Sequence, residues 1–380
     1  MATRKPRKAP STAPHAAGTI LFTGFPGFIG ARLIPRLLEL RPGARFACLV
    51  QEKFLDAAHE SVRALAAAHP RTKGRLDLVV GDITAPGLGM GESSARKLRT
   101  ELTGAFHLAA VYDLAVEREL AERVNVEGTR QVLAFASSCP RLEALHYAST
   151  CYVSGRHAGV FRETDLDVGQ SFKNHYEETK FRAEILVQEA MRGGMPASVY
   201  RPSVVVGDSS TGATQKYDGP YMLIRWILKL PLVAVLPMVG DPETVRLNVV
   251  PRDFVVRAMA HLSADPRSRG RVFHLADPEP LTVDEIVRAV EAASGRYVVR
   301  VSLPLAVAKA ALERVPGVQA FMQIPSAGLD YFHHSTTYAT EATSEALRES
   351  GIELPRLRDY LPRLVAYVRA HPDVPSAAMA

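Results

Sequence analysis

Two side chains that can share a proton stand one helical turn apart in the stretch HYEETK, residues 175–180. Residues four apart lie on the same face of a helix, so Tyr176 and Lys180 are expected to point the same way. A free tyrosine has a pKa of about 10 and exchanges its proton poorly at neutral pH, but a neighbouring ammonium favours the phenolate and lowers that pKa. By itself, such a pair is typical of an ordinary helix surface.

Two hydroxyls precede this helix at the end of a predicted strand. The stretch HYASTCYVSG carries Ser149 and Thr150, and Thr150 lies 26 residues before Tyr176. At the carboxyl edge of a sheet, Thr150 can hydrogen-bond a carbonyl oxygen while Tyr176 gives it a proton. The three residues Thr150, Tyr176 and Lys180 together predict acid and base chemistry on a carbonyl group, with Lys180 also placed to bind a ribose hydroxyl.

The first predicted turn of the chain is rich in glycine. The stretch TGFPGFIG places Gly24, Gly27 and Gly30 between an apolar strand and an amphipathic helix. Glycines there let the backbone approach a pyrophosphate, whose charge then meets the free amides of the helix N-terminus. Phe28 and Ile29 in this turn are expected to contact the cofactor as well. The turn predicts a dinucleotide site, and a tight turn without a ligand is the alternative.

The end of the second predicted strand, FACLVQEKF, bears on the choice of cofactor. Sites for NAD usually carry an acidic residue there, which holds the ribose hydroxyls. Here the strand ends in Gln51, the cation Lys53 follows two places later, and Arg32 lies on the first helix. An uncharged strand end beside cations favours a 2′-phosphate. We therefore expect NADP(H), with NAD(H) as the alternative, and a solvated surface side chain is the other reading of Lys53.

Further cofactor contacts are expected where the next two strands end, because ligands of open α/β sheets bind at the carboxyl ends. Asp82 in VVGDIT can accept a hydrogen bond from the adenine amino group. The small residues of HLAAVYD leave room for the cofactor, although a loop cap and tight packing explain these residues as well. The expected contacts at the two strand ends are Asp82, Ile83, Leu108, Ala109 and Ala110.

Strand and helix patterns alternate through the first two hundred residues. Apolar strand patterns stand at GTILFT, FACLV, RLDLVVGD, GAFHLAA, LEALHYAST and ASVYRPSVVVG, and amphipathic helices are expected near 54–69, 92–102, 117–138 and 176–192. This alternation implies a parallel sheet that helices cover on both faces. We predict an α/β fold, a Rossmann-type doubly wound parallel sheet with a smaller, discontinuous C-terminal substrate-binding domain.

The alternation of strands and helices ends near Gly207, and we place the main domain boundary there. A flexible basic leader covers 1–17, and an NAD(P)-binding Rossmann domain covers 18–206. The strand GRVFHLAD and the helix TVDEIVRAVEAAS return to the main pattern, so 245–290 should complete the sheet. The substrate-binding domain then comprises 207–244 and 291–380. We expect its apolar segment at 221–239 to contact the substrate and to select it by shape.

Composition narrows the class of protein. The chain has 380 residues, of which 47% are hydrophobic, so most of it is too apolar to be disordered. The formal net charge of the chain is +6, and four of its positive charges lie in the leader. The folded body is therefore only mildly basic, and nucleic acid is not an expected partner. Three scattered cysteines predict no disulfides, no metal site and a cytoplasmic location. Charges and prolines interrupt the apolar segment, so no transmembrane segment is expected.

These motifs, in this order, resemble the extended short-chain dehydrogenases/reductases. The resemblance rests on TGFPGFIG, GDIT, HLAA, NVEGT, STCYVSG and YEETK, and it runs from about Thr19 to His371. It implies that Thr150 is the catalytic hydroxyl, Tyr176 the acid and base, and Lys180 its partner. It also implies that Asn125 supports the active site, and that Ser203 in RPSVVVG contacts the cofactor near the nicotinamide.

Within that superfamily, GDITAPGLGM, RPSVVVGDSSTGATQKYDGPY and NVVPRDFVVRAMAHL resemble the male-sterility branch of thioester and fatty acyl-CoA reductases. This resemblance implies reduction of a hydrophobic carbonyl by NADP(H), above all an acyl thioester carried on coenzyme A or a carrier protein, or the derived aldehyde. It implies a function in lipid metabolism, and a homodimer is the expected assembly if the chain associates.

Two other functions fit part of the pattern. The same proton chemistry serves epimerases, dehydratases and hydroxysteroid-type dehydrogenases, which act on nucleotide sugars or alcohols. The apolar segment at 221–239 argues against a sugar diphosphate, which would require more fixed cations. A non-catalytic dinucleotide-binding regulator is the third hypothesis, and the presence of Thr150, Tyr176 and Lys180 argues against it.

Overall fold

Seven parallel strands form the central sheet of the computed structural model, which describes residues 18–230, 232–304, 307, 331 and 335–375. In spatial order they are β11 (Val272–Leu275), β7 (Ala197–Pro202), β5 (Ala144–Ala148), β4 (Leu102–His107), β1 (Thr19–Thr23), β2 (Arg45–Val50) and β3 (Leu76–Val80). The strand order reverses beside β1, and ligands of open α/β sheets bind at such a point, here outside the carboxyl ends of β1 and β4. The predicted α/β fold with a Rossmann-type parallel sheet is confirmed.

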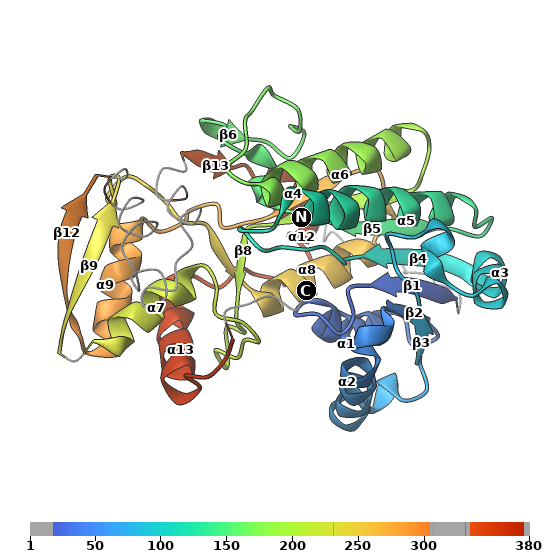
Figure 1. Ribbon diagram of the computed structural model, residues 1–380, viewed down its shortest axis with the longest axis horizontal. Coiled ribbons are helices and arrows are strands. Elements are labelled where there is room, and N and C mark those ends of the chain that lie inside the picture. The colour runs from blue at the N-terminus through green and yellow to red at the C-terminus, as the bar shows by residue number, and fades with distance from the viewer. Residues whose placement is uncertain (1–17, 231, 305–306, 308–330, 332–334, 376–380) are drawn as a thin grey trace, which may run out of the picture.

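Helices cover both faces of this sheet (Figure 1). On one face lie α1 (Gly30–Leu40), α2 (Leu55–Ala68) and α8 (Arg252–Ala264), and on the other α3 (Glu92–Glu101), α5 (Gly128–Ser137) and α6 (His175–Arg192). In α1 the apolar side chains recur at helical spacing, and Leu33, Ile34 and Leu37 are fully buried against α8 and the sheet. Each face of the sheet therefore has its own apolar core.

The predicted helix at 117–138 is divided into three parts. It comprises α4 (Arg118–Ala121), a π-helical segment at Glu122–Glu127 and α5. π-Helical segments inside longer helices are rare and frequently mark functional sites. This segment contains the buried Asn125, so the irregular turn coincides with a residue that the sequence predicts for the active site.

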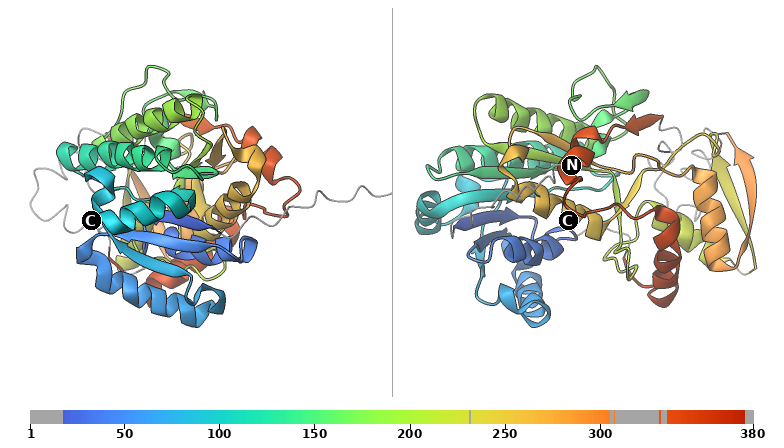
Figure 2. Two further views of the ribbon diagram at one scale, coloured as in Figure 1. Left: turned by 90° about the vertical axis from the view of Figure 1, so that its right-hand side faces the viewer. Right: turned by 180° about the vertical axis from the view of Figure 1, so that it is seen from behind.

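A smaller unit lies at one end of the sheet, on the left in Figure 1 and on the right in the rear view of Figure 2. Two parallel strands, β9 and β12, pack there against three helices around an apolar core. The elements are α7 (Pro220–Lys229), β9 (Val233–Val239), α9 (Val283–Ser294), β12 (Tyr297–Leu303) and α13 (Leu357–Ala370). Segments far apart in sequence thus build one unit beside the carboxyl end of the sheet.

Two helices lie elsewhere than the sequence suggests. The helix TVDEIVRAVEAAS is α9, and its apolar face packs against α7 and α13 of the smaller unit instead of returning to the main sheet. Helix α12 (Glu341–Leu347) packs on α8 and β11 of the larger unit. Glu163 helps to place α12, because its carboxylate accepts hydrogen bonds from the backbone amides of His274, Ala342 and Thr343. The domain boundaries themselves stay a prediction, and the leader at 1–17 lies outside the described residues.

Two short parallel pairs complete the connections around the sheet. Strand β8 (Val204–Val206) pairs with β10 (Val249–Pro251), and β6 (Gly159–Phe161) pairs with β13 (Thr336–Tyr338). The pair of β8 and β10 follows directly on β7 and leads into α8. It therefore links the carboxyl edge of the sheet to the smaller unit.

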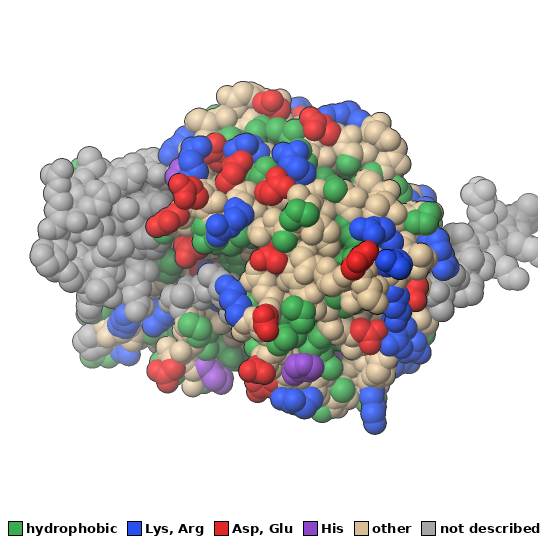
Figure 3. Space-filling view, turned by 45° about the vertical axis from the view of Figure 1, so that its right-hand side comes forward, with side chains coloured by type: hydrophobic (Ala, Val, Ile, Leu, Met, Phe, Trp, Pro, Cys, Tyr) green, Lys and Arg blue, Asp and Glu red, His purple; other side chains and the backbone are tan. Residues whose placement is uncertain are grey.

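Several general properties follow from the same structure. Cys48, Cys139 and Cys151 are free and buried. Within the described ranges no group of histidine, cysteine and carboxylate side chains is arranged to hold a metal ion, and no helix combines the length and apolar character needed to cross a bilayer. The face in Figure 3 carries acidic and basic side chains side by side.

Candidate active site

The glycine turn meets the end of β4 at the carboxyl edge of the sheet. Gly24 has a φ of 87°, and a Cβ atom there would lie 2.8 Å from the backbone nitrogen of Ala109. A Cβ atom on Gly30 would lie 2.7 Å from the carbonyl oxygen of Gly24, and one on Gly27 would lie equally close to that oxygen. Only glycine fits these positions, because the turn folds back on itself and on residues 108 and 109.

The same turn presents unsatisfied amides at the start of α1. Within the described residues, the backbone nitrogens of Phe28 and Ile29 donate no hydrogen bond. Ile29 is the N-cap residue, its side chain caps nothing, and the first turn of α1 holds no acidic residue. Free amides at the positive end of a helix dipole suit an anion such as a phosphate.

Gln51 and Asp82 meet at the ends of β2 and β3. The Gln51 side-chain amide donates to the Asp82 carboxylate at 2.9 Å, and the backbone nitrogen of Thr84 donates to the same carboxylate at 2.8 Å. Burial alone would raise the pKa of Asp82, but the hydrogen bonds from Thr84 and Gln51 outweigh it and lower that pKa. Asp82 is thus a fixed, ionised acceptor at this edge.

The two expected cations near Gln51 are exposed. The Lys53 ammonium lies 4.7 Å from the centroid of the Phe54 ring, and the Arg32 side chain is open to solvent on α1. Ile83 turns inward instead, since a Cβ atom on Gly128 would lie 2.8 Å from its Cδ1 atom. Ile83 therefore packs the loop after β3 against α5.

Asn125 holds the loop that follows β4. Its side-chain oxygen accepts from the Val111 backbone nitrogen at 2.9 Å, and its side-chain nitrogen donates to the Val111 carbonyl at 3.1 Å and to the Thr179 hydroxyl at 3.0 Å. At the other end of the same loop, the Ala109 nitrogen donates to the Thr23 hydroxyl at 3.2 Å. Leu108, Ala109 and Ala110 are fixed between these two anchors, and Asn125 also ties the loop to α6.

Thr150 and Tyr176 are brought together at the end of β5. The Thr150 hydroxyl accepts from the Tyr152 nitrogen at 3.2 Å and donates to the Pro202 carbonyl at 3.4 Å. Burial raises the pKa of Tyr176, and the neighbouring Thr150 hydroxyl only partly opposes this shift. Ser149 is occupied elsewhere, because its hydroxyl donates to the buried Glu184 carboxylate at 2.5 Å. Thr150 is therefore the hydroxyl of this pair that faces the phenol.

Lys180 lies on the same helix but contacts other partners. Its ammonium donates to the Tyr147 hydroxyl and to the Ala148 carbonyl, both at 2.8 Å. Burial lowers the pKa of Lys180 to about 7, although the Glu184 carboxylate opposes the shift. The expected lowering of the Tyr176 pKa by Lys180 is wrong for this structure, because burial of the phenol dominates and drives its pKa upward.

Ser203 lies between β7 and β8 and is buried. It is 5% exposed, and its side-chain oxygen has no hydrogen-bond partner in the part of the chain that the structure describes. A buried hydroxyl without a partner is unusual and calls for a group that is not part of the chain. The orphaned hydroxyl is consistent with the predicted contact to a cofactor.

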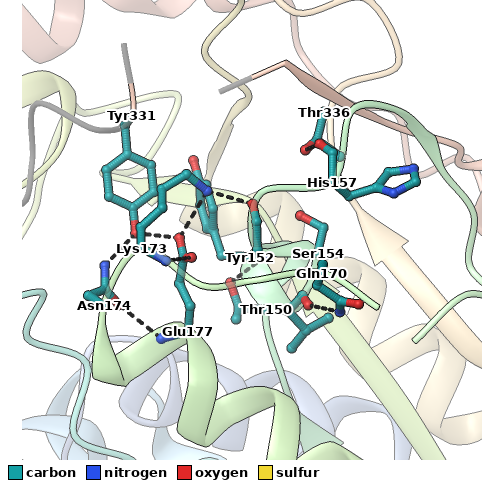
Figure 4. A network of polar contacts seen from close by, with 12 residues as sticks. Thr150, Tyr152, Ser154, His157, Gln170, Lys173, Asn174, Glu177, Tyr331 and Thr336 are labelled. Carbon is teal, nitrogen blue, oxygen red and sulfur yellow. Dashed lines mark hydrogen bonds and ion pairs between the residues drawn. The ribbon is translucent and has the colours of Figure 1, made fainter. Parts of the chain in front are cut away.

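A buried polar network that the sequence analysis missed adjoins Tyr176 (Figure 4). The fully buried Glu177 accepts from the Tyr331 hydroxyl at 2.7 Å and from the Lys173 backbone nitrogen at 3.0 Å, and the Lys173 ammonium lies 3.4 Å from its carboxylate. Asn174 caps α6 by accepting from the Glu177 nitrogen at 2.9 Å. The only sequence signal for this network was the Asn cap, three residues before the acid.

The chain is similar to known proteins over most of its length. A family described as male sterility protein matches residues 22–259. A linear gramicidin synthase polypeptide from Brevibacillus parabrevis is 27% identical over 360 residues, which is 90% of this chain and 7% of that protein. Glycine betaine reductase ATRR from Emericella nidulans is 29% identical over 285 residues, 71% of this chain and 22% of that protein. The chain thus spans less than a quarter of the length of either relative.

Solved structures share the whole architecture. The terminal R domain of the myxalamid PKS-NRPS biosynthetic pathway superposes with a TM-score of 0.79 at 27% identity, covering 96% of this chain and 93% of that one. UDP-glucuronic acid 4-epimerase from Bacillus cereus, in complex with NAD, superposes with a TM-score of 0.65 at 20% identity, covering 94% and 99%, a likeness of fold. The predicted family is confirmed: the chain belongs to the male sterility protein family, within the extended short-chain dehydrogenases/reductases.

Proposed function

We propose that the chain is an NADP(H)-dependent oxidoreductase that reduces a hydrophobic carbonyl, above all an acyl thioester or the derived aldehyde. One observation carries the proposal. Thr150 and Tyr176 lie beside each other at the carboxyl edge of the sheet, with Lys180 on the same helix as Tyr176, in a family fold whose glycine turn suits a dinucleotide. Asn125 positions the adjoining loop and helix.

The residues at the carboxyl edge of the sheet fit a dinucleotide. Free amides at Phe28 and Ile29 suit its pyrophosphate, and the unpartnered Ser203 hydroxyl suits a polar group at the nicotinamide end, each judged within the described residues. When bound, NADPH would supply the hydride. The residues proposed to hold it are Gly24, Gly27, Phe28, Ile29, Gly30, Arg32, Gln51, Lys53, Asp82, Ile83, Leu108, Ala109, Ala110, Tyr176, Lys180 and Ser203.

Each catalytic side chain then has one task. Thr150 donates a hydrogen bond to the carbonyl oxygen and holds it beside the Tyr176 phenol. Because burial raises the pKa of Tyr176, the phenol keeps its proton at neutral pH and can give it to the oxygen as negative charge develops there. Lys180 as an ammonium would bind a ribose hydroxyl of the dinucleotide. With a thioester, the hemithioacetal formed would collapse to an aldehyde and a thiol.

The substrate class rests on the relatives and on the smaller unit. The similar proteins include a glycine betaine reductase and an aldehyde reductase, and the myxalamid structure is a terminal R domain of a synthase pathway. Apolar side chains of α7 and β9 contribute to the core of the smaller unit. These observations support a hydrophobic acyl group delivered on coenzyme A or on a carrier protein.

Preference for NADP(H) over NAD(H) is the finer part of the proposal. The end of β2 carries Gln51, whose amide donates to Asp82, so the position itself has no negative charge. Lys53 and Arg32 are exposed nearby and would meet a 2′-phosphate. We also propose a cytoplasmic location, which the three free cysteines support. The proposed assembly is a homodimer, and nucleic acid is not proposed as a partner.

Oxidation of NADPH, and in parallel of NADH, with long-chain acyl-CoA, decanal or a nucleotide sugar tests this function. Turnover with the acyl thioester or the aldehyde is expected. Turnover with the nucleotide sugar alone would support an epimerase or dehydrogenase of the alternative class. Tight dinucleotide binding without turnover of any substrate would instead support a non-catalytic regulator.

Tyr176→Phe tests the proton donor. The variant keeps the ring but removes the phenol proton, and we expect kcat to fall by about 100-fold or more. The dissociation constant for NADPH, measured by titration calorimetry, should stay within about twofold, because binding draws on many other contacts. A fully active Tyr176→Phe protein would show that another group supplies the proton.

A further inference from the structure

Arg252, the first residue of α8, is a cation that is almost fully buried. It is only 4% exposed, and within the described residues its guanidinium takes part in no hydrogen bond and no ion pair. Its side chain contacts the glycine turn, where its Cζ atom lies 4.7 Å from the centroid of the Phe28 ring. A buried charge of this kind normally has an anionic partner.

The nearby carboxylates do not supply that partner. Asp253, on α8, accepts from the backbone nitrogen and the hydroxyl of Ser209 and pairs with Arg257, and Asp208 accepts from Ser210 and Thr211, so neither carboxylate forms an ion pair with Arg252. Burial and the like charge of Arg32 lower the pKa of Arg252, and the charges of Asp208 and Asp253 oppose this shift only in part. The two cations lie close enough to repel each other, and a bound anion would relieve this repulsion.

The position of Arg252 points to the glycine turn. Its backbone nitrogen donates to the Gly207 carbonyl at 3.3 Å, which joins the start of α8 to the loop that leaves the sheet after β8. Its side chain then reaches Phe28, whose own amide, like that of Ile29, has no acceptor among the described residues. A guanidinium stacked on a ring keeps its edge N–H groups available for planar, bidentate contact with phosphate oxygens.

We propose that Arg252, with the free amides of Phe28 and Ile29, forms a phosphate-binding site between α8 and the glycine turn. The inference rests on the proposed function for its ligand. The phosphate belongs either to the dinucleotide or to the substrate carrier, as in coenzyme A or a phosphopantetheine arm. Arg32, at the rim of this site, adds positive charge but stays solvated.

Arg252→Gln tests the site by removing the charge while keeping a similar length. The dissociation constants for NADPH and NADH are measured by titration calorimetry, and KM is measured with decanoyl-CoA and with decanoyl-pantetheine, which has no phosphate. Loss of a charge-assisted contact should weaken the phosphate-bearing ligand by about 10- to 100-fold. Arg257→Gln, five residues later on α8 and ion-paired with Asp253, is the matched control and should leave all four values within about twofold.

The pattern of loss identifies the source of the phosphate. Equal weakening of NADPH and NADH assigns the pyrophosphate, and weakening of NADPH alone assigns the 2′-phosphate. A higher KM for decanoyl-CoA with unchanged decanoyl-pantetheine and dinucleotide values assigns the substrate phosphate. Four unchanged values in a folded Arg252→Gln protein would overturn the proposal.

Two further measurements distinguish a folding defect of Arg252→Gln from failure of the proposed function. If Arg252→Gln does not fold, Arg252→Lys retains the charge but not the bidentate geometry, and it is expected to weaken the same ligand by a smaller factor. Inorganic pyrophosphate should raise the melting temperature of the wild-type protein more than that of Arg252→Lys. This pyrophosphate shift requires no turnover, so it can succeed even if the proposed reaction fails, and equal shifts in both proteins would count against the site.

Discussion

At the scale of single residues, Lys180 and Tyr176 respond to burial in opposite senses. Burial removes water from both side chains and so favours the neutral form of each. For Lys180 this lowers the pKa to about 7, and for Tyr176 it raises the pKa. Near neutral pH the phenol therefore holds its proton while the lysine is divided between ammonium and amine. A proposed mechanism that uses the ammonium thus depends on pH in a range where the phenol does not titrate.

The titration of Lys180 should be visible in the dependence of kcat/KM on pH. The ammonium predominates below pH 7 and is lost as the pH rises, so kcat/KM for reduction should fall above about pH 7, with a limiting slope of about tenfold per pH unit. Steady-state rates between pH 6 and 9 measure this, with a melting temperature recorded at each pH to exclude unfolding. A flat profile over that range would contradict an essential ammonium at Lys180.

At the scale of elements, the glycine turn between β1 and α1 packs closely against the end of β4, in addition to its proposed role in dinucleotide binding. Gly24 combines a positive φ with contact to the backbone at residues 108 and 109. Gly74 has a positive φ too, 68°, but a Cβ atom there would meet nothing within 4 Å. Comparing the two positions therefore separates two contributions to the free energy of unfolding. One is the cost of a positive φ for a residue with a Cβ atom, and the other is the cost of a close contact with neighbouring backbone.

Gly24→Ala and Gly74→Ala form a matched pair. Gly74→Ala should lower the free energy of unfolding by about 1 kcal/mol, the cost of left-handed backbone for alanine. Gly24→Ala should lower it by a further 1–3 kcal/mol or so, and weaken NADPH binding, because its Cβ atom must displace the end of β4. Urea denaturation measures the first effect and calorimetric titration the second. Equal losses in the two variants would mean that the close approach to β4 has no energetic role.

At the scale of the whole molecule, Tyr331 from the last fifth of the chain contacts the start of α6. Tyr331 lies 154 residues after Glu177, yet its hydroxyl donates to that buried carboxylate, and Asn174 donates to the same hydroxyl at 3.0 Å. The Tyr331 ring also meets the Tyr152 ring edge-on, with 5.1 Å between centroids. The start of α6, and with it Tyr176, is thereby tied to the C-terminal part of the chain (Figure 4).

Tyr331→Phe should loosen this connection. The variant leaves the fully buried Glu177 with one donor fewer, and the free energy of unfolding should fall by about 1–3 kcal/mol. Because Tyr176 precedes Glu177 directly, we also expect a lower kcat with an unchanged dissociation constant for NADPH. Tyr297→Phe, on the exposed face of β12, is the control and should change neither the stability nor the rate. Identical behaviour of both variants would show that the Tyr331 hydroxyl does not support α6.

Local sequence patterns were sufficient for the parallel sheet, the glycine turn and the helix that carries Tyr176 and Lys180. These features depend on short-range rules: glycine for positive φ, helical periodicity for a shared face, and alternation of strands and helices for a parallel sheet. The family followed from the order of the motifs, and the comparisons confirm it. The individual roles of the predicted site residues stay predictions.

Only the tertiary structure decided how those residues are surrounded. The sequence predicted that Lys180 would lower the pKa of Tyr176, but burial raises that pKa, and Lys180 bonds to Tyr147 and Ala148 instead. The contact of Tyr331 with Glu177 and that of Arg252 with Phe28 join residues more than 150 positions apart. No local pattern specifies such contacts or the burial that shifts a pKa, because both arise when distant segments pack together and exclude water.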